Sequence, residues 1–286
     1  MKKYLSLVKI EHTLFALPFA LASFTMALVK TDYGFSVKQF VLVLLCMLFA
    51  RSSAMGFNRY ADRFIDARNS RTVKRDIPAG KVSSRAALVF VIINCLLFII
   101  SAGLLNKTCF VLSPVALAVV LGYSYTKRFT PMCHFVLGLG LSIAPMGAWM
   151  AVTAGFNVLP LLLSISVLFW TGGFDIIYAL QDKNFDREQK LHSLPAWLGV
   201  KKALRISSVS HFIAAVFVAA LGVYGQFYII YWVGYVLFVF MLLWQHRIVS
   251  PDKLDRVEEA FFNGNSVAAA LFSLCFIADM IIFGAR

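Results

Sequence analysis

Residues 37–66 read VKQFVLVLLCMLFARSSAMGFNRYADRFID, a long apolar run that ends in a cluster of charged side chains. A helix needs about 20 mostly apolar residues to cross a bilayer, and the run from 37 to 57 meets that length. The polar stretch that follows places Asn58, Asp62 and Asp66 four residues apart, so they share one face if the helix continues. Carboxylates at this spacing repel each other, which indicates a cation between them.

The composition shows that the whole chain is as rich in apolar residues as a membrane protein. Of the 286 residues, 60% are hydrophobic and only 14% are charged, and the mean hydropathy is +0.79. Strand-like alternation is absent, and an open sheet cannot satisfy its backbone in lipid, so we expect an all-α integral membrane protein. We read the first apolar run as a retained helix, not a signal peptide. Nine transmembrane helices are predicted, near 12–29, 37–57, 86–105, 108–125, 133–153, 158–180, 206–223, 226–245 and 266–284.

The basic residues predict an orientation. Most of the 27 Lys and Arg residues lie in the N-terminus and in the loops after the second, fourth, sixth and eighth spans. Cytoplasmic loops collect such residues, so we expect a bacterial-type cytoplasmic membrane, the N-terminus inside and the C-terminus outside. The same rule explains the net charge of +13 without a nucleic-acid partner. The five cysteines form no C-x-x-C pair and are interpreted as small buried hydrophobes.

The aspartates near the ends of the second and sixth spans require another explanation, because the orientation of a membrane protein depends on its Lys and Arg residues and not on its acids. Residues 175–186, DIIYALQDKNFD, repeat the Asp-x-x-x-Asp pair as Asp182 and Asp186, 120 residues after Asp62 and Asp66. Asp175 lies two helical turns before Asp182. We therefore predict two four-helix repeats plus one further helix, with both pairs meeting at one membrane face, since such repeats often place a site at their interface.

Hard oxygen ligands with few carboxylates suit Mg²⁺, especially when phosphate oxygens complete the coordination. Basic side chains near the motifs suit a diphosphate: Arg63, Arg68, Arg71, Lys74, Arg75, Lys127 and Arg128. No His or Cys cluster at zinc spacing accompanies them. The alternative is that the acids only pair with loop arginines at a helix end, and two copies of the motif make this less favoured.

Together these motifs resemble the UbiA superfamily of intramembrane aromatic prenyltransferases. That family has Asn-Asp-x-x-Asp-x-x-x-Asp after its second helix and Asp-x-x-x-Asp after its sixth. Its Tyr-x-x-x-Lys motif is matched by Tyr123 and Lys127, and its Arg-Pro-Leu-Pro-x-Gly loop resembles RDIPAG at 75–80. Lys9 lies where the family usually has Arg. The resemblance covers nearly the whole chain.

The resemblance implies a single domain over residues 1–286, a nine-helix bundle around a central cavity with cap loops near 58–85 and 181–205. It implies a Mg²⁺-dependent polyprenyltransferase of quinone biosynthesis that releases diphosphate. Catalysis would use Asp62, Asp66, Asp175, Asp182 and Asp186. Four of these acids, without Asp175 but with Asn58, would hold Mg²⁺ and the prenyl diphosphate. Arg63 and Lys127 would contact the phosphates, and the other substrate-binding candidates are Lys9, Arg51, Asn58, Arg75, Tyr123, Tyr178 and His192.

Two departures leave the acceptor open. Arg59 stands where the family usually has Asp, and His192-Ser193 replaces Lys-Ser. These residues resemble a 4-hydroxybenzoate polyprenyltransferase-like branch, some of whose members are assigned to menaquinone synthesis through a dihydroxynaphthoate. Both acceptors are aromatic hydroxy acids, and the residues alone do not separate them. The sequence predicts no oligomeric state and no prenyl chain length.

Two other classes compete with the enzyme. A secondary transporter also combines repeats with intramembrane acids, and Gly172-Gly173 before Asp175 would mark the broken helix such a protein needs. A phosphotransferase acting on lipid alcohols also uses membrane carboxylates and metal, but its compact Asp- and Gly-rich motif is absent.

Overall fold

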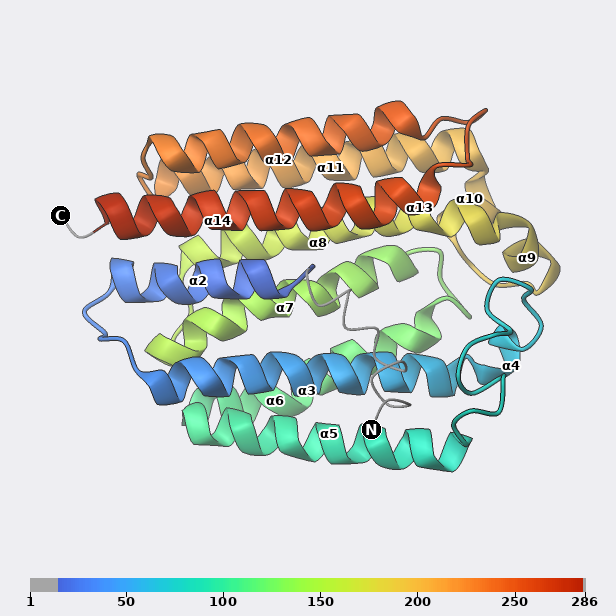
Figure 1. Cartoon of the computed structure of the whole chain (residues 1–286), viewed down its shortest axis with the longest axis horizontal. Coiled ribbons are helices and arrows are strands. Elements are labelled where there is room, and N and C mark those ends of the chain that lie inside the picture. Colours follow the sequence, from blue (N-terminus) through green and yellow to red (C-terminus); the bar gives the residue numbers. More distant parts are fainter. Residues whose placement is uncertain (1–14, 285–286) are drawn as a thin grey trace. The chain divides into compact units, whose positions relative to one another are not determined.

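A computed structural model describes residues 15–284, and these residues form helices joined by short loops (Figure 1). Nine long helices lie within that range: α2 Leu17–Lys30, α3 Val37–Ala61, α5 Ser84–Leu105, α6 Lys107–Thr126, α7 Cys133–Thr153, α8 Val158–Ala179, α11 Val200–Tyr224, α12 Ile229–Ile248 and α14 Asn265–Phe283. Short elements connect them: α4 Arg63–Asp66, η2 Leu180–Asp182, α9 Lys183–Glu188, α10 Leu194–Leu198, α13 Val257–Glu259 and the π-helical turn η3 Ala260–Gly264.

The all-α membrane fold is confirmed. Among residues 15–284, eight helices are long and apolar enough to cross a bilayer, and α2 is a shorter apolar helix, so the predicted count of nine is approximate. Several helix boundaries differ from the prediction by a few residues. Helix α3 continues to Ala61, four residues past the predicted end, and α11 begins at Val200, six residues before the predicted start. Both extensions contain basic residues, so hydropathy alone assigns these segments to loops.

Side chains cap several helices where the chain leaves the apolar region. Ser83 Oγ accepts a hydrogen bond from the Ala86 backbone N–H at 3.2 Å, and Asn157 Oδ1 accepts one from Leu159 N–H at 2.9 Å. Asn106 alone separates α5 from α6, and its Oδ1 accepts from Cys109 N–H at 2.9 Å. These caps satisfy backbone donors that a helix start leaves unpaired, so the turns are encoded locally.

The chain divides into two compact units. One contains Ser36–Tyr125, hence helices α3 to α6, and the other contains α2 with all elements after Thr126. Within the second unit, Ser23 on α2 donates to the Pro145 carbonyl of α7 at 2.7 Å, and Phe19 packs on Trp170 of α8 at 5.1 Å between ring centroids. The chain therefore divides after the fourth span, where the predicted repeats also divide, but the first span, α2, belongs to the second unit.

Glycines allow close helix packing in the second unit. A Cβ at Gly138 of α7 would lie 2.3 Å from the Leu168 carbonyl oxygen of α8, and a Cβ at Gly173 would lie 2.3 Å from the His211 ring of α11. Small residues let backbones approach in this way in membranes. Helix α8 runs unbroken through Gly172 and Gly173, as the predicted span 158–180 requires, so the break that a transporter would need is not found there. These glycines serve packing instead.

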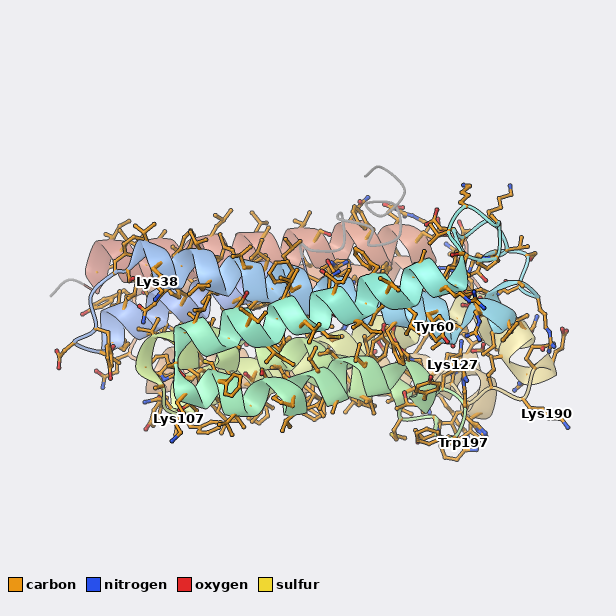
Figure 2. All side chains as sticks on the ribbon, turned by 90° about the horizontal axis from the view of Figure 1, so that it is seen from below. Lys38, Tyr60, Lys107, Lys127, Lys190 and Trp197 are labelled. Atoms are coloured by element: carbon orange, nitrogen blue, oxygen red, sulfur yellow. The ribbon has the colours of Figure 1, made fainter. Side chains whose placement is uncertain are left out.

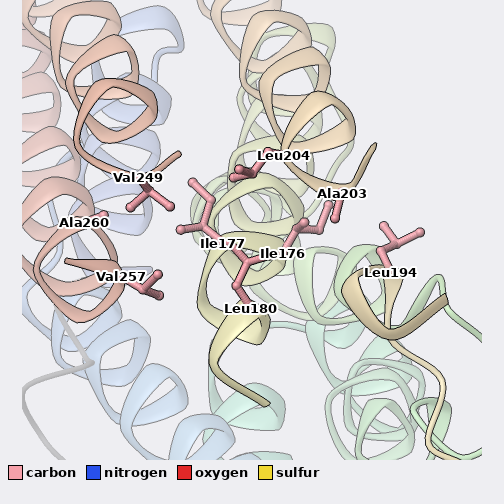
Figure 3. Close-up of a cluster of buried hydrophobic side chains, with 9 residues drawn as sticks. All are labelled: Ile176, Ile177, Leu180, Leu194, Ala203, Leu204, Val249, Val257 and Ala260. Atoms are coloured by element: carbon pink, nitrogen blue, oxygen red, sulfur yellow. The ribbon is translucent and has the colours of Figure 1, made fainter. Parts of the chain in front are cut away.

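The side chains labelled in Figure 2 lie at the ends of the helices in each unit. In the first unit, Lys38 and Lys107 lie at one end of the helices and Tyr60 at the other (Figure 2). In the second unit, Lys127, Lys190 and Trp197 lie together at one end (Figure 2). A cluster of buried apolar side chains supports that end of the second unit (Figure 3): Ile176, Ile177, Leu180, Leu194, Ala203, Leu204, Val249, Val257 and Ala260. Through this cluster, the end of α8 packs against α10, α11 and the turn before α14.

One buried acid caps a helix from a neighbouring one. Asp279 of α14 is 1% exposed, and its carboxylate accepts hydrogen bonds from the backbone N–H groups of Tyr228, Ile230 and Tyr231 at 2.9–3.1 Å. These donors belong to the start of α12, where the helix dipole also favours a negative charge. Asp279 therefore has a structural role that the sequence analysis did not identify.

We expect Asp279→Leu to destabilise the protein by about 2–4 kcal/mol, because three donors in an apolar setting lose their acceptor. Asp279→Asn keeps one acceptor oxygen and should lose less. The midpoint of thermal unfolding in detergent measures both. Asp252→Leu, at an exposed acid, is the matched control, and equal midpoints for the two Leu variants would contradict the capping role.

Candidate active site

The first acidic motif begins where α3 ends. Asp62 follows the helix, and its N–H still bonds the Asn58 carbonyl at 2.9 Å, while Asp66 N–H bonds the Asp62 carbonyl at 2.8 Å. The Asn58 side-chain amide donates to Asp62 Oδ2 at 3.1 Å. The helical hydrogen-bond spacing therefore continues through the motif, even though Asp62 itself leaves the helical conformation.

The second motif repeats this backbone. Asp62 has φ −91° and ψ 7°, and Asp182 has φ −97° and ψ 3°. Both values fall in the sparsely allowed region between helix and strand, where many active-site residues lie. A short helix follows each one, and its fourth residue is the second acid of the pair, Asp66 in α4 and Asp186 in α9. The 120-residue sequence repeat is thus also a conformational repeat.

Asp66 is held within the first unit by the loop that follows it. Its carboxylate Oδ1 accepts from Arg75 at 2.7 Å, and its backbone carbonyl accepts from the Thr72 hydroxyl at 3.0 Å. Gly80, with φ +71°, lets the loop turn back so that Val82 N–H reaches the Asp76 carbonyl at 3.1 Å. Within residues 15–284, Asp66 Oδ2 is buried and has no hydrogen-bond partner.

Asp186 is fully buried and is compensated on both oxygens. Lys127 Nζ lies 2.7 Å from Oδ1, and the Ser193 hydroxyl donates to Oδ2 at 2.7 Å. Burial by itself lowers the pKa of Lys127, but the charge of Asp186 and the bond to it outweigh burial and raise the pKa above its ordinary value. Lys127 is therefore a permanent cation beside the second acidic pair at physiological pH.

The segment from 191 to 194 holds the backbone of both Asp186 and Lys127. Leu191 N–H bonds the Asp186 carbonyl at 2.8 Å, and His192 N–H bonds the Lys127 carbonyl at 2.7 Å. The Ser193 hydroxyl also caps α10 by accepting from Ala196 N–H at 3.4 Å. The His192 side chain, predicted to bind substrate, is exposed, and the structure assigns its backbone a structural role.

Asp175 lies on α8 with a buried partner that sequence reasoning missed. His134 Nδ1 is 2.7 Å from Asp175 Oδ2, and the two side chains are 3% and 22% exposed. The backbone N–H of Leu194 donates to His134 Nε2 at 3.3 Å. No local signal indicated this contact, because 41 residues separate the two side chains.

Arg63, which the sequence predicts to contact phosphate, lies over two aromatic rings. Its guanidinium lies 4.4 Å from the Tyr60 ring centroid and 4.3 Å from the Phe64 centroid, and it donates to the Tyr60 carbonyl at 2.6 Å. The ring of Tyr60 thus faces the Arg63 cation within its own unit.

The other predicted substrate-binding residues belong to both units. Arg51 of α3 and Tyr123 of α6 lie within electrostatic range of each other in the first unit. Tyr178 packs on Phe261 of the π-helical turn at 4.1 Å between ring centroids, and Phe174 is 2% exposed in the same aromatic cluster. Lys9 lies outside the described residues.

The predicted Mg²⁺ ligands are oxygen donors from the two acidic motifs. Among residues 15–284, no three His, Cys, Asp or Glu side chains lie close enough together to hold a metal ion. The donor set still fits Mg²⁺ chemically, because the motifs present hard oxygens and Asp66 Oδ2 is a buried oxygen without a partner in that range.

Comparison with known proteins decides the family. The model of the UbiA prenyltransferase family matches residues 16–267. The chain belongs to this family. The resemblance seen in the sequence motifs is thereby confirmed, and the UbiA assignment covers both acidic motifs.

Curated UbiA relatives align over most of their length. A 4-hydroxybenzoate octaprenyltransferase of Actinobacillus pleuropneumoniae is 29% identical over 233 residues, covering 81% of this chain and 79% of the relative. The protein of the same name from Tolumonas auensis is 28% identical over 223 residues, covering 78% of each.

Solved UbiA structures share the fold. The apo structure of a UbiA homologue from Aeropyrum pernix is 33% identical, with a TM-score of 0.85 over 95% of this chain and 98% of that one. A UbiA homologue from Archaeoglobus fulgidus, solved with GPP and Mg²⁺, has a TM-score of 0.75 at 20% identity, over 98% and 99%. The helical architecture is therefore that of the UbiA family.

Lys127→Met should lower the free energy of unfolding by about 1–2 kcal/mol, because buried Asp186 loses its cation while solvent screens part of the loss. Adding Asp186→Asn should recover most of that stability, since no uncompensated charge remains. Thermal unfolding in Mg²⁺-free detergent measures both variants. Lys202→Met, at an exposed lysine, is the control, and additive losses in the double variant would contradict the pairing.

Proposed function

We propose that this UbiA protein transfers a polyprenyl group from a prenyl diphosphate to an aromatic hydroxy acid in quinone biosynthesis and releases diphosphate. The observation that carries the proposal is the conformational repeat of the two acidic motifs, each with a buried carboxylate paired to a basic side chain. Carboxylates and fixed cations together suit a metal-bound diphosphate. The family match over residues 16–267 supports the same chemistry.

The proposed Mg²⁺ ligands are Asn58, Asp62, Asp66, Asp182 and Asp186, with Arg75 and Lys127 as neighbouring cations. Bound Mg²⁺ would neutralise charge on the leaving diphosphate. Asp66 could take a cation through Oδ2 while Oδ1 keeps its bond to Arg75. Support for the metal and the donor substrate also comes from the Archaeoglobus homologue, which was solved with GPP and Mg²⁺.

The reaction breaks the allylic C–O bond, and its electron pair leaves with the diphosphate. A ring carbon of the acceptor forms the new C–C bond, and that carbon then loses its proton, whose bonding pair restores the aromatic ring. An apolar helix bundle keeps water from the allylic cation. We propose that Asp175, partly exposed at the end of α8, lies at the reacting centre and contacts the acceptor.

The acceptor proposed is 4-hydroxybenzoate, because the curated relatives that align over about four-fifths of the chain are named for that substrate. A dihydroxynaphthoate of menaquinone synthesis is the alternative, which Arg59 beside the first acidic pair keeps open. We also propose that the active-site end faces the cytoplasm of a bacterial-type inner membrane, on the basis of the basic loops. The transporter alternative loses its main support, since α8 is unbroken.

Asp62→Asn and Asp182→Asn should each reduce prenyl transfer by at least about 100-fold, because each removes an anionic metal ligand. The measurement is diphosphate release by purified protein supplied with prenyl diphosphate, Mg²⁺ and 4-hydroxybenzoate. Asp252→Asn is the matched control at an exposed acid. Near-normal turnover in both variants, at unchanged thermal stability, would refute the metal assignment.

Acceptor profiling tests the substrate class. We expect faster turnover with 4-hydroxybenzoate than with 1,4-dihydroxy-2-naphthoate at equal concentration, with mass spectrometry to identify the prenylated product. The reverse order would assign the protein to the naphthoate route. Folded protein that prenylates neither acid would overturn the proposed function.

A further inference from the structure

Two hydrogen bonds orient the ring of His134. The backbone N–H of Leu194 points to Nε2 at 3.3 Å, so Nε2 presents its lone pair. The Nδ1 N–H then donates to Asp175 Oδ2 at 2.7 Å. His134 is 2% exposed, so water does not compete for these bonds. The ring is thus a directed donor to Asp175.

The residues that hold His134 are themselves fixed. Leu194 is fully buried in the apolar cluster of Figure 3, and it begins α10 directly after the cap Ser193. Ser193 bonds Asp186, which in turn pairs with Lys127. A continuous chain of contacts therefore runs from Lys127 through Asp186, Ser193 and Leu194 to His134 and Asp175. It joins the second acidic pair to the acid at the end of α8.

The contact uses only one oxygen of Asp175. Within residues 15–284, His134 is the hydrogen-bond partner of Oδ2, and no described group bonds Oδ1. The side chain is 22% exposed, so Oδ1 can reach a ligand while Oδ2 is held. This arrangement resembles the way a buried partner fixes a reacting side chain in other enzymes.

We propose that His134 is a positioning residue for prenyl transfer, which holds Asp175 oriented with Oδ1 toward the aromatic acceptor. The inference rests on the proposed function, and it extends that function to a residue outside all the acidic motifs. His134 acts through Asp175 and does not itself contact the substrate. Its removal therefore affects turnover more than binding of the prenyl diphosphate.

The test compares His134→Leu with His134→Asn. The Leu variant removes the donor and should lower kcat by about 10–100-fold, with KM for the prenyl diphosphate changed less than about twofold. The Asn amide can place an N–H near the position of Nδ1, so this variant should recover at least a third of the wild-type kcat. His211→Leu is the matched control, a buried histidine on α11 that pairs with His246 at 3.0 Å.

The decisive measurement is made in an Asp175→Asn background. If His134 acts through Asp175, His134→Leu causes no further loss of kcat there, whereas independent effects multiply. Multiplying effects, a kcat for His134→Leu above half of wild type, or equal losses of kcat and thermal stability in the His134 and His211 variants would each overturn the proposal. Wild-type protein that transfers no prenyl group refutes the proposed function instead, before any His134 variant is compared.

Discussion

A carboxylate without solvent exposure at the end of a membrane helix must be compensated by its own protein, and Asp186 shows how this is done. Removing its charge from water is costly, and Lys127 and Ser193 offset that cost by occupying both oxygens. Because Lys127 follows α6 and Ser193 precedes α10, the acid also fixes the loop ends that surround it. The local electrostatic requirement therefore organises the polar end of the second unit.

The same requirement explains the similarity of the two acidic motifs. Asp66 is also buried and is also paired, with Arg75 in place of Lys127. In both motifs the first acid leaves the helical conformation and the second lies four residues later in a short helix. The cation comes from a different place in each motif. In the first it lies in the loop that follows the acids, and in the second it lies far earlier in the chain.

Polar contacts away from the motifs are equally specific. Asp279 caps α12 from another helix, and His134 binds Asp175 across 41 residues. In an apolar protein each buried polar group needs a partner, because the alternative is an unsatisfied group in hydrocarbon. A lone acid within the last apolar run was a usable sequence signal for Asp279. His134 offered none, since its partner is identified only by the packing of α7 on α8.

The sequence by itself determined the helical membrane fold, the approximate helix ranges and the two acidic motifs, because apolar length and four-residue spacing are local properties. It also determined the family. Only the tertiary structure decided that α2 packs with the later helices, that Gly172 and Gly173 leave α8 intact, and which basic or imidazole group serves each acid. Those outcomes depend on contacts between residues distant in the chain, and local patterns carry no information about them.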